Sequence, residues 1–123
     1  MDYSSKLNNL LGATARENAS DLHIGVGCRP TLRIDGALVP MEKEEILTPE
    51  AVLGLVKALV SKEQEEKLTR NKQIDFAYSY EDKARFRVNA YYQRGYLAAA
   101  LRLIPGQIRP IDALDIMNII GAV

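Results

Sequence analysis

The chain has 123 residues, 47% of them hydrophobic, and its 16 Lys and Arg residues balance its 16 Asp and Glu residues. This length suits one domain with its own core, and the balanced charge argues against a general nucleic-acid or anionic-membrane surface. The single cysteine, Cys28, has no partner for an internal disulfide, and no apolar run approaches the length of a membrane span. The composition predicts one reduced, cytoplasmic domain that binds no nucleic acid.

The first predicted element is an amphipathic helix over residues 4–18, with Ser4 or Ser5 as its N-cap. Spacings of three and four residues put its buried side chains on one stripe: Leu7, Leu10, Leu11 and Thr14.

A strand is predicted directly after this helix, because Leu22 and Ile24 alternate with Asp21 and His23. The strand therefore points an acid and the only histidine of the chain to the same face. We favour a structural pair, in which the carboxylate fixes the imidazole tautomer, over catalysis. A hydrolase would need a nucleophile within reach, and one histidine with scattered acids is too small a set for a metal site.

A β-hairpin follows the loop at residues 25–30. Its strands are predicted over residues 31–35 and 37–40, and Asp35-Gly36 is a strong signal for the tight turn between them. Together with the strand of Asp21 and His23, this hairpin predicts a β-meander.

Two abutting helices are predicted over residues 49–60 and 62–70. Thr48 is the expected N-cap of the first helix, with a proline at its first position. Ser61 and Gln64 form a capping box that starts the second helix at once.

From Ile74 the hydrophobic period drops to two, which predicts three strands ending near Ile104. A two-residue turn at Arg94-Gly95 would place Gln93 opposite Tyr96. The core pairs predicted from this register are Phe86 with Leu103, Val88 with Leu101, Ala90 with Ala99, and Tyr92 with Leu97.

The same register predicts that Arg87 lies opposite Arg102 on the face away from the core. Like charges in this position repel each other unless an anion sits between them, and guanidinium groups suit a carboxylate or a phosphate. The alternative is that Asp75 pairs diagonally with Arg87 while Arg102 is solvated. Arg33 also lies on the polar face of its strand.

Nucleotide-binding loops are absent from the sequence. Gly25-Val26-Gly27 lacks the third glycine of the dinucleotide pattern, and no P-loop motif occurs. We therefore expect no catalytic residues and no bound cofactor in this chain alone.

Four stretches, taken together, resemble a known family. They are residues 19–24 (ASDLHI), residues 30–36 (PTLRIDG), residues 84–91 (ARFRVNAY) and residues 101–105 (LRLIP). In this order and spacing they resemble the N-terminal domain of the PilT family of type IV pilus retraction ATPases, in the type II/IV secretion ATPase superfamily. The resemblance runs to about Pro105.

The resemblance implies a PAS-like α+β domain over residues 1–105, with residues 106–123 as the linker and truncated start of the connection to a RecA-like ATPase domain. Such motors are homo-hexamers that use ATP and Mg²⁺, work at the cytoplasmic side of the inner membrane with the pilus machinery, and drive twitching motility. The domain would contact the motor domains of its own and the neighbouring subunit.

The resemblance also implies roles for single residues. Arg87 and Arg102, with Arg33, would reach the ATP phosphates once a motor domain is present. Asp21, His23, Asp35 and Gly36 would be structural residues.

A stand-alone PAS-like sensor or regulator is the alternative function. It would need an apolar pocket lined by the small residues Ala90, Ala98, Ala99 and Ala100. These alanines could instead let a helix pack closely on the sheet.

Overall fold

The computed structural model describes residues 2–105, and the predicted linker at residues 106–123 lies outside the described residues. The predicted α+β class is confirmed: the described chain forms an antiparallel sheet with helices packed on it. In chain order the elements are α1 (Tyr3–Arg16), β1 (Asp21–Gly25), β2 (Thr31–Ile34), β3 (Ala37–Pro40), α2 (Pro49–Leu59), α3 (Lys62–Asn71), β4 (Gln73–Tyr80), β5 (Ala84–Gln93) and β6 (Tyr96–Leu103).

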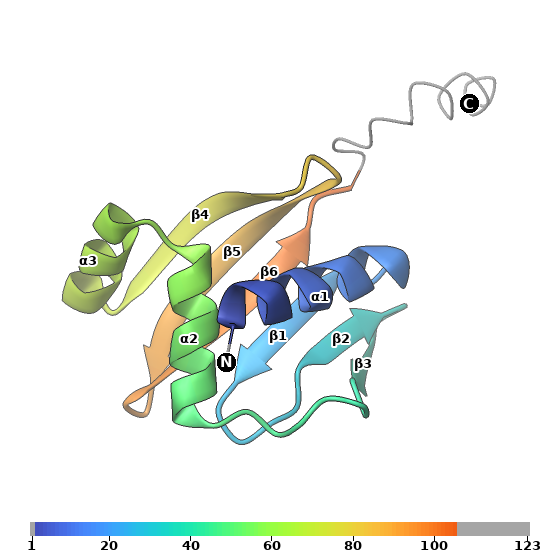
Figure 1. The fold of residues 1–123 in the computed structure, drawn as a ribbon, viewed down its shortest axis with the longest axis horizontal. Coiled ribbons are helices and arrows are strands. Elements are labelled where there is room, and N and C mark those ends of the chain that lie inside the picture. The colour runs from blue at the N-terminus through green and yellow to red at the C-terminus, as the bar shows by residue number, and fades with distance from the viewer. Residues whose placement is uncertain (1, 106–123) are drawn as a thin grey trace.

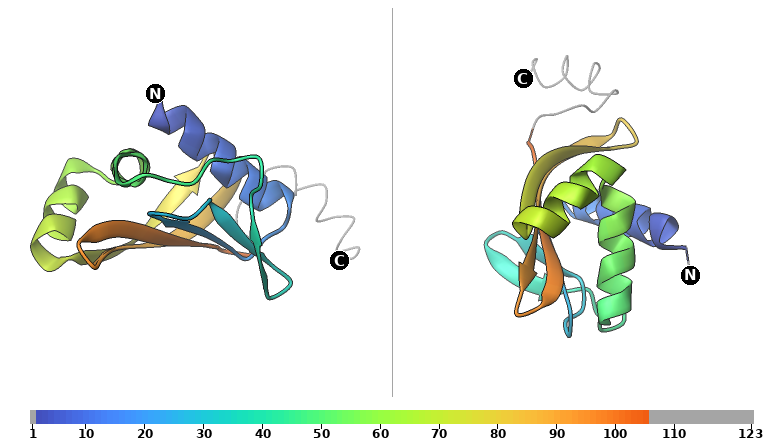
Figure 2. Two further views of the ribbon diagram at one scale, coloured as in Figure 1. Left: turned by 90° about the horizontal axis from the view of Figure 1, so that it is seen from below. Right: turned by 90° about the vertical axis from the view of Figure 1, so that its left-hand side faces the viewer.

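The six strands form one sheet in the order β3-β2-β1-β6-β5-β4, with β1 and β6 at its centre. Figures 1 and 2 show α1 and α2 packed on one face of this sheet, with α3 beside β4 at its edge. None of the helices formed by residues 2–105 lies on the opposite face. Alternate side chains of each strand therefore either enter the core or lie on this open face.

Asp2 is the N-cap of α1, so the prediction of Ser4 or Ser5 is wrong. The Asp2 carboxylate accepts hydrogen bonds from the backbone N–H groups of Ser4 at 3.0 Å and Ser5 at 3.2 Å. Serine is a common N-cap residue, but here the carboxylate of Asp2 accepts the hydrogen bonds of the first free N–H groups of the helix. The helix ends at Arg16, because Asn18 adopts a positive φ of 56°.

The signals for α2 and α3 are confirmed. Thr48 caps α2 by accepting from the N–H of Ala51, and Pro49 occupies the first helical turn. Ser61 and Gln64 form the reciprocal capping box of α3. Each helix therefore begins at the residue where its N-terminal N–H groups find side-chain acceptors.

Both predicted two-residue turns are present. Asp35 and Gly36 have φ values of 51° and 83°, and Arg94 and Gly95 have φ values of 55° and 85°. Positive φ at both central positions is the type I′ geometry that matches the twist of a hairpin.

The predicted register of β5 against β6 is confirmed. Phe86 lies opposite Leu103, Val88 opposite Leu101 and Ala90 opposite Ala99. These pairs face the helices, and Phe86, Val88 and Leu101 are fully buried. Tyr92 lies opposite Leu97 as predicted, but it is 36% exposed, so the expectation that this fourth pair belongs to the core is wrong.

The alanines proposed for a sensor pocket lie on two different faces. Ala90 and Ala99 are buried in the core, and α2 contacts β6 there, so they do allow close helix packing. Ala98 and Ala100 alternate with them and pair with Gly25 and His23 of β1. The expected pocket lined by all four alanines is therefore not formed.

The contact between α1 and α2 depends on Gly54. A Cβ atom at this position would overlap the Cδ2 atom of the Tyr3 ring, far inside van der Waals contact. We predict that Gly54→Ala destabilises the fold by about 1 kcal/mol, because the overlap outweighs the higher helix propensity of alanine. Urea unfolding followed by circular dichroism would measure the change.

The matched control places Gly54→Ala in a Tyr3→Ala background. Without the tyrosine ring the alanine should stabilise α2 by up to about 1 kcal/mol, so that the sign of the effect reverses. An equal loss of stability in both backgrounds would contradict the proposed contact.

Candidate functional site

Charged side chains form a row across the open face of the sheet. The register pairs Arg33 of β2 with Asp21 of β1, Asp21 with Arg102 of β6, and Arg102 with Arg87 of β5. Neighbouring strands lie about 4.8 Å apart, so the row extends over about 14 Å. We call Arg33, Asp21, Arg102 and Arg87 the arginine row.

Asp21 is the buried member of this row and is held by two hydrogen bonds. It is 7% exposed, and its carboxylate accepts a hydrogen bond from the Ser20 hydroxyl at 2.7 Å. Its other oxygen accepts from Nε of Arg102 at 3.3 Å. Because only Nε is used, the terminal nitrogens of the Arg102 guanidinium remain available for another acceptor.

These contacts set the ionisation of Asp21. Burial desolvates the carboxylate and alone would raise its pKa, but the Ser20 hydroxyl and the positive charge of Arg102 outweigh that effect. The pKa of Asp21 is therefore lower than its ordinary value of 3.8. The acid stays negative at neutral pH and balances one of the arginines of the row.

Arg87 and Arg102 face each other as predicted. The Arg102 side chain is 72% exposed, and Arg87 is also exposed. The alternative partner of Arg87, Asp75, instead lies opposite Asn89 and accepts a hydrogen bond from its amide at 3.0 Å. Among residues 2–105, Arg87 forms no ion pair with Asp75.

Arg33 stands apart from the other two arginines. It lies two strands from Arg102, with Asp21 between them, and its guanidinium donates to the carbonyl oxygen of Gly36 at 2.9 Å. The structure therefore brings Arg87 and Arg102 together and holds Arg33 against its own hairpin. Asp35 and Gly36 form that hairpin turn.

The expected hydrogen bond between Asp21 and His23 is not formed. The carboxylate contacts Ser20 and Arg102 instead, since adjacent same-face positions along a strand are farther apart than directly opposed ones. Within the part of the chain that the structure describes, Nε2 of His23 is buried without a hydrogen-bond partner. Sequence reasoning missed both true partners, although the cross-strand position of Arg102 follows once β1 is placed beside β6.

No group of three or more His, Cys, Asp or Glu residues that could hold a metal ion occurs within residues 2–105. None of the helices in this range is long and apolar enough to cross a membrane.

No family model matches the sequence. The chain is 30% identical over 115 residues to the type IV pilus ATPase PilU of Pseudomonas aeruginosa, which covers 94% of this chain and 30% of PilU. It is 30% identical over 113 residues to the type IV pilus retraction ATPase PilT of the same organism, which covers 88% of this chain and 31% of PilT. The chain thus spans about a third of the length of these relatives.

Solved structures agree with these relatives. The chain superposes on the pilus retraction motor PilT with bound ADP with a TM-score of 0.76 and 32% identity, over 82% of this chain and 29% of that one. The Legionella pneumophila ATPase DotB gives a TM-score of 0.67 at 24% identity, also over 82% of this chain and 29% of that one, and supports the fold alone.

The lowered pKa of Asp21 predicts how stability depends on pH. We expect Asp21→Asn to lower the free energy of unfolding by about 1 kcal/mol at neutral pH, because the variant loses two charge-assisted contacts, one of them to an exposed arginine. A folded-state pKa below 3.8 means that the contribution of the carboxylate is complete above pH 3.8 and is lost as the pH falls through the lower value.

Urea unfolding at neutral pH and near pH 3 would measure this difference. The difference in the free energy of unfolding between the native chain and Asp21→Asn should be smaller at the acidic pH. Asp75→Asn, an exposed acid on the same face, is the matched control and should change stability little at either pH. If Asp21→Asn lowered the free energy of unfolding equally at both pH values, the ionised carboxylate would not be the source of the stabilisation.

Proposed function

Because the chain is a homologue of PilT and PilU, in the type II/IV secretion ATPase superfamily, we propose that it acts as the N-terminal domain of a type IV pilus retraction motor. In this role the PAS-like domain senses nucleotide and helps to assemble a homo-hexamer. ATP and Mg²⁺ are held by the RecA-like motor domain, and none of the residues of this chain carries out the hydrolysis.

The observation that carries this proposal is the facing pair of Arg87 and Arg102. Two guanidinium groups directly opposite each other repel, and an anion between them would remove that cost. A triphosphate is such an anion, and its oxygens match the fork of N–H donors that each arginine offers. Asp21 supports the pair by holding Arg102 through Nε only.

The position of the pair supports the same role. Arg102 is the second-last residue of β6, which ends at Leu103, two residues before Pro105. The expected linker to the motor domain starts at residue 106. The arginines therefore lie at the end of the domain that a following motor domain would approach, and ATP held by that domain could contact them.

The arginines are expected to act only together with a motor domain. When two exposed side chains bind a nucleotide without a P-loop, ordering the side chains and removing their water costs free energy. The contacts that they form with the phosphates offset little of this cost. The remaining surface would contact the motor domain of the neighbouring subunit, and the hexamer would act in the cytoplasm at the pilus machinery of the inner membrane.

A chimera tests the proposal. Residues 2–105 would replace the matching region of Pseudomonas aeruginosa PilT, and the chimera would first be required to hydrolyse ATP. We predict that Arg87→Ala and Arg102→Ala each lower kcat/KM for ATP at least about tenfold, because each removes a charged donor to phosphate oxygens. Steady-state ATPase assays would measure the loss.

Arg70→Ala, on the exposed side of α3, is the matched control and should leave ATPase activity within about twofold of the parent chimera. Calorimetry on the 123-residue chain alone should detect no ATP binding at micromolar concentrations. The proposal would be overturned if Arg87→Ala and Arg102→Ala both left kcat/KM unchanged, or if the chain alone bound ATP at micromolar concentrations.

A further inference from the structure

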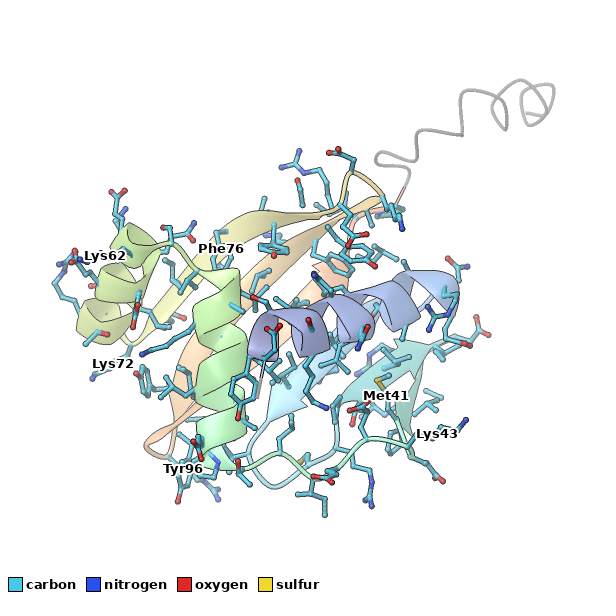
Figure 3. All side chains as sticks on the ribbon, in the orientation of Figure 1. Met41, Lys43, Lys62, Lys72, Phe76 and Tyr96 are labelled. Carbon is cyan, nitrogen blue, oxygen red and sulfur yellow. The ribbon has the colours of Figure 1, made fainter. Side chains whose placement is uncertain are left out.

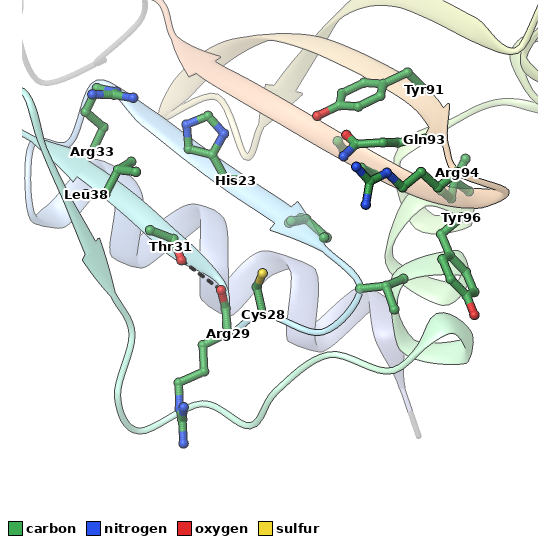
Figure 4. A pocket seen from close by; sticks show the side chains of 16 residues that line it. His23, Cys28, Arg29, Thr31, Arg33, Leu38, Tyr91, Gln93, Arg94 and Tyr96 are labelled. Carbon is green, nitrogen blue, oxygen red and sulfur yellow. Dashed lines mark hydrogen bonds between the residues drawn. The ribbon is translucent and has the colours of Figure 1, made fainter.

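A second feature of the open face is a groove of about 610 Å³ beside the arginine row. The two sites share only Arg33. Figure 4 shows His23 in the middle of this groove, Arg33 and Leu38 toward one end, and Tyr91 and Arg94 toward the other. Its volume is in the range of ligand sites, which is about 300–1,000 Å³.

The groove is positively charged. Arg29, Arg33 and Arg94 line it, and its 16 lining residues include no Asp or Glu. The whole chain has a formal net charge of zero, so the fold has separated the charges here. A surface with this charge attracts anionic partners and repels cationic ones.

The arginines of the groove do not converge on one point. Arg29 belongs to the loop after β1, Arg33 to β2, and Arg94 to the turn between β5 and β6. Figure 4 shows Arg33 and Arg94 toward opposite ends of the groove, with the Arg29 side chain pointing away from both. One phosphate is bound by donors that meet at its oxygens. Donors spread around a groove instead suit a ligand with several separate carboxylates.

Apolar side chains at the rim of the groove favour a ligand that has an apolar part as well as negative charge. Leu38 is 56% exposed and Tyr96 is 52% exposed, and they stand at opposite sides of the groove. Between them the floor is formed by small residues, among them Gly25 and Ala98 of the paired strands β1 and β6. An apolar side chain of a partner could be buried on this floor against the two rim residues.

The wall of the groove is held in place by backbone contacts. In the loop after β1, the N–H of Gly27 donates to the carbonyl of Leu47 at 2.8 Å, and the carbonyl of Cys28 accepts from the N–H of Leu47 at 2.9 Å. Nε of Arg29 donates to the carbonyl of Glu44 at 3.0 Å. A wall that is already ordered costs less entropy when a partner binds.

We propose that this groove binds an acidic polypeptide segment that carries an apolar side chain between its carboxylates. Single-stranded nucleic acid is a poorer match, because the two tyrosines of the groove, Tyr91 and Tyr96, both lie toward one end of it, whereas a stacking platform needs aromatic rings along the path of the strand. The groove site does not depend on the proposed nucleotide role, since Arg87 and Arg102 do not line it.

The test uses a fluorescein-labelled synthetic peptide of repeated Glu-Glu-Leu units and the 123-residue chain. We expect saturable binding by fluorescence anisotropy that weakens as salt is added, with NMR amide shifts centred on His23, Gly25 and Ala98. A Lys-Lys-Leu peptide of the same length should not bind.

Arg94→Asn is the primary variant, because asparagine tolerates the positive φ of this turn position and the fold is retained. We expect affinity for the acidic peptide to fall about threefold in this variant and about tenfold in Arg94→Asn/Arg29→Gln. Lys62→Gln/Arg70→Gln is the matched control, because it removes two positive charges from α3, and Figure 3 shows Lys62 well apart from Tyr96. Its affinity should stay within about twofold of the native chain.

Several results would overturn the proposal. These are the absence of saturable binding, equal loss of affinity in the α3 control, amide shifts centred away from the groove, and preference for a single-stranded oligonucleotide over the acidic peptide. Because the readout is peptide affinity and not ATPase activity, failure here is distinct from failure of the proposed motor function.

Discussion

The turn at Arg94-Gly95 fixes the register of β5 against β6, and the chemistry of the open face depends on that register. With two residues in the turn, Phe86, Val88 and Ala90 enter the core opposite apolar partners. A slip by one residue would exchange the faces, bury Arg87 and expose Phe86. Burial of an unpaired guanidinium costs more free energy than a different turn could contribute. The register that buries Phe86 and Val88 therefore also keeps Arg87 and Arg102 opposite each other on the open face.

Asp21 gives the arginine row its electrostatic balance. Its carboxylate sits between Arg33 and Arg102, and it binds the second of these through Nε. Arg102 therefore keeps donors free while its position is restrained, which is the arrangement that an anion-binding arginine needs. Arg87 has no such restraint from Asp75, whose contact is with Asn89. The two arginines of the pair thus differ in how far their positions are fixed before any anion arrives.

The same open face carries two different arrangements of positive charge. At the end of β6 the arginines are close together and exposed, which suits a compact phosphate group. In the groove the positive charges are spread around an apolar floor, which suits a longer chain of carboxylates. Both follow from covering only one face of an antiparallel sheet with helices, because the alternate residues of every strand are then left for binding.

The sequence by itself determined the elements and the local geometry of this protein. The capping box of α3, the N-cap of α2, both two-residue turns and the β5–β6 register depend on residues close together in the chain, so local steric and hydrogen-bonding rules were sufficient. The cap of α1 was assigned wrongly because several suitable cap residues stand side by side there. The resemblance to the retraction ATPases likewise followed from short motifs in order.

Only the tertiary structure decided which of these elements meet. The pairing of β1 with β6 joins Asp21 to Arg102, 81 positions later, and no local pattern determines a pairing across that separation. The same pairing left His23 without the expected partner. The groove likewise collects residues from a loop, two hairpins and the sheet face. Long-range pairing is chosen by burial of the whole core, so the site that lies on its outer face appears only when the complete sheet is assembled.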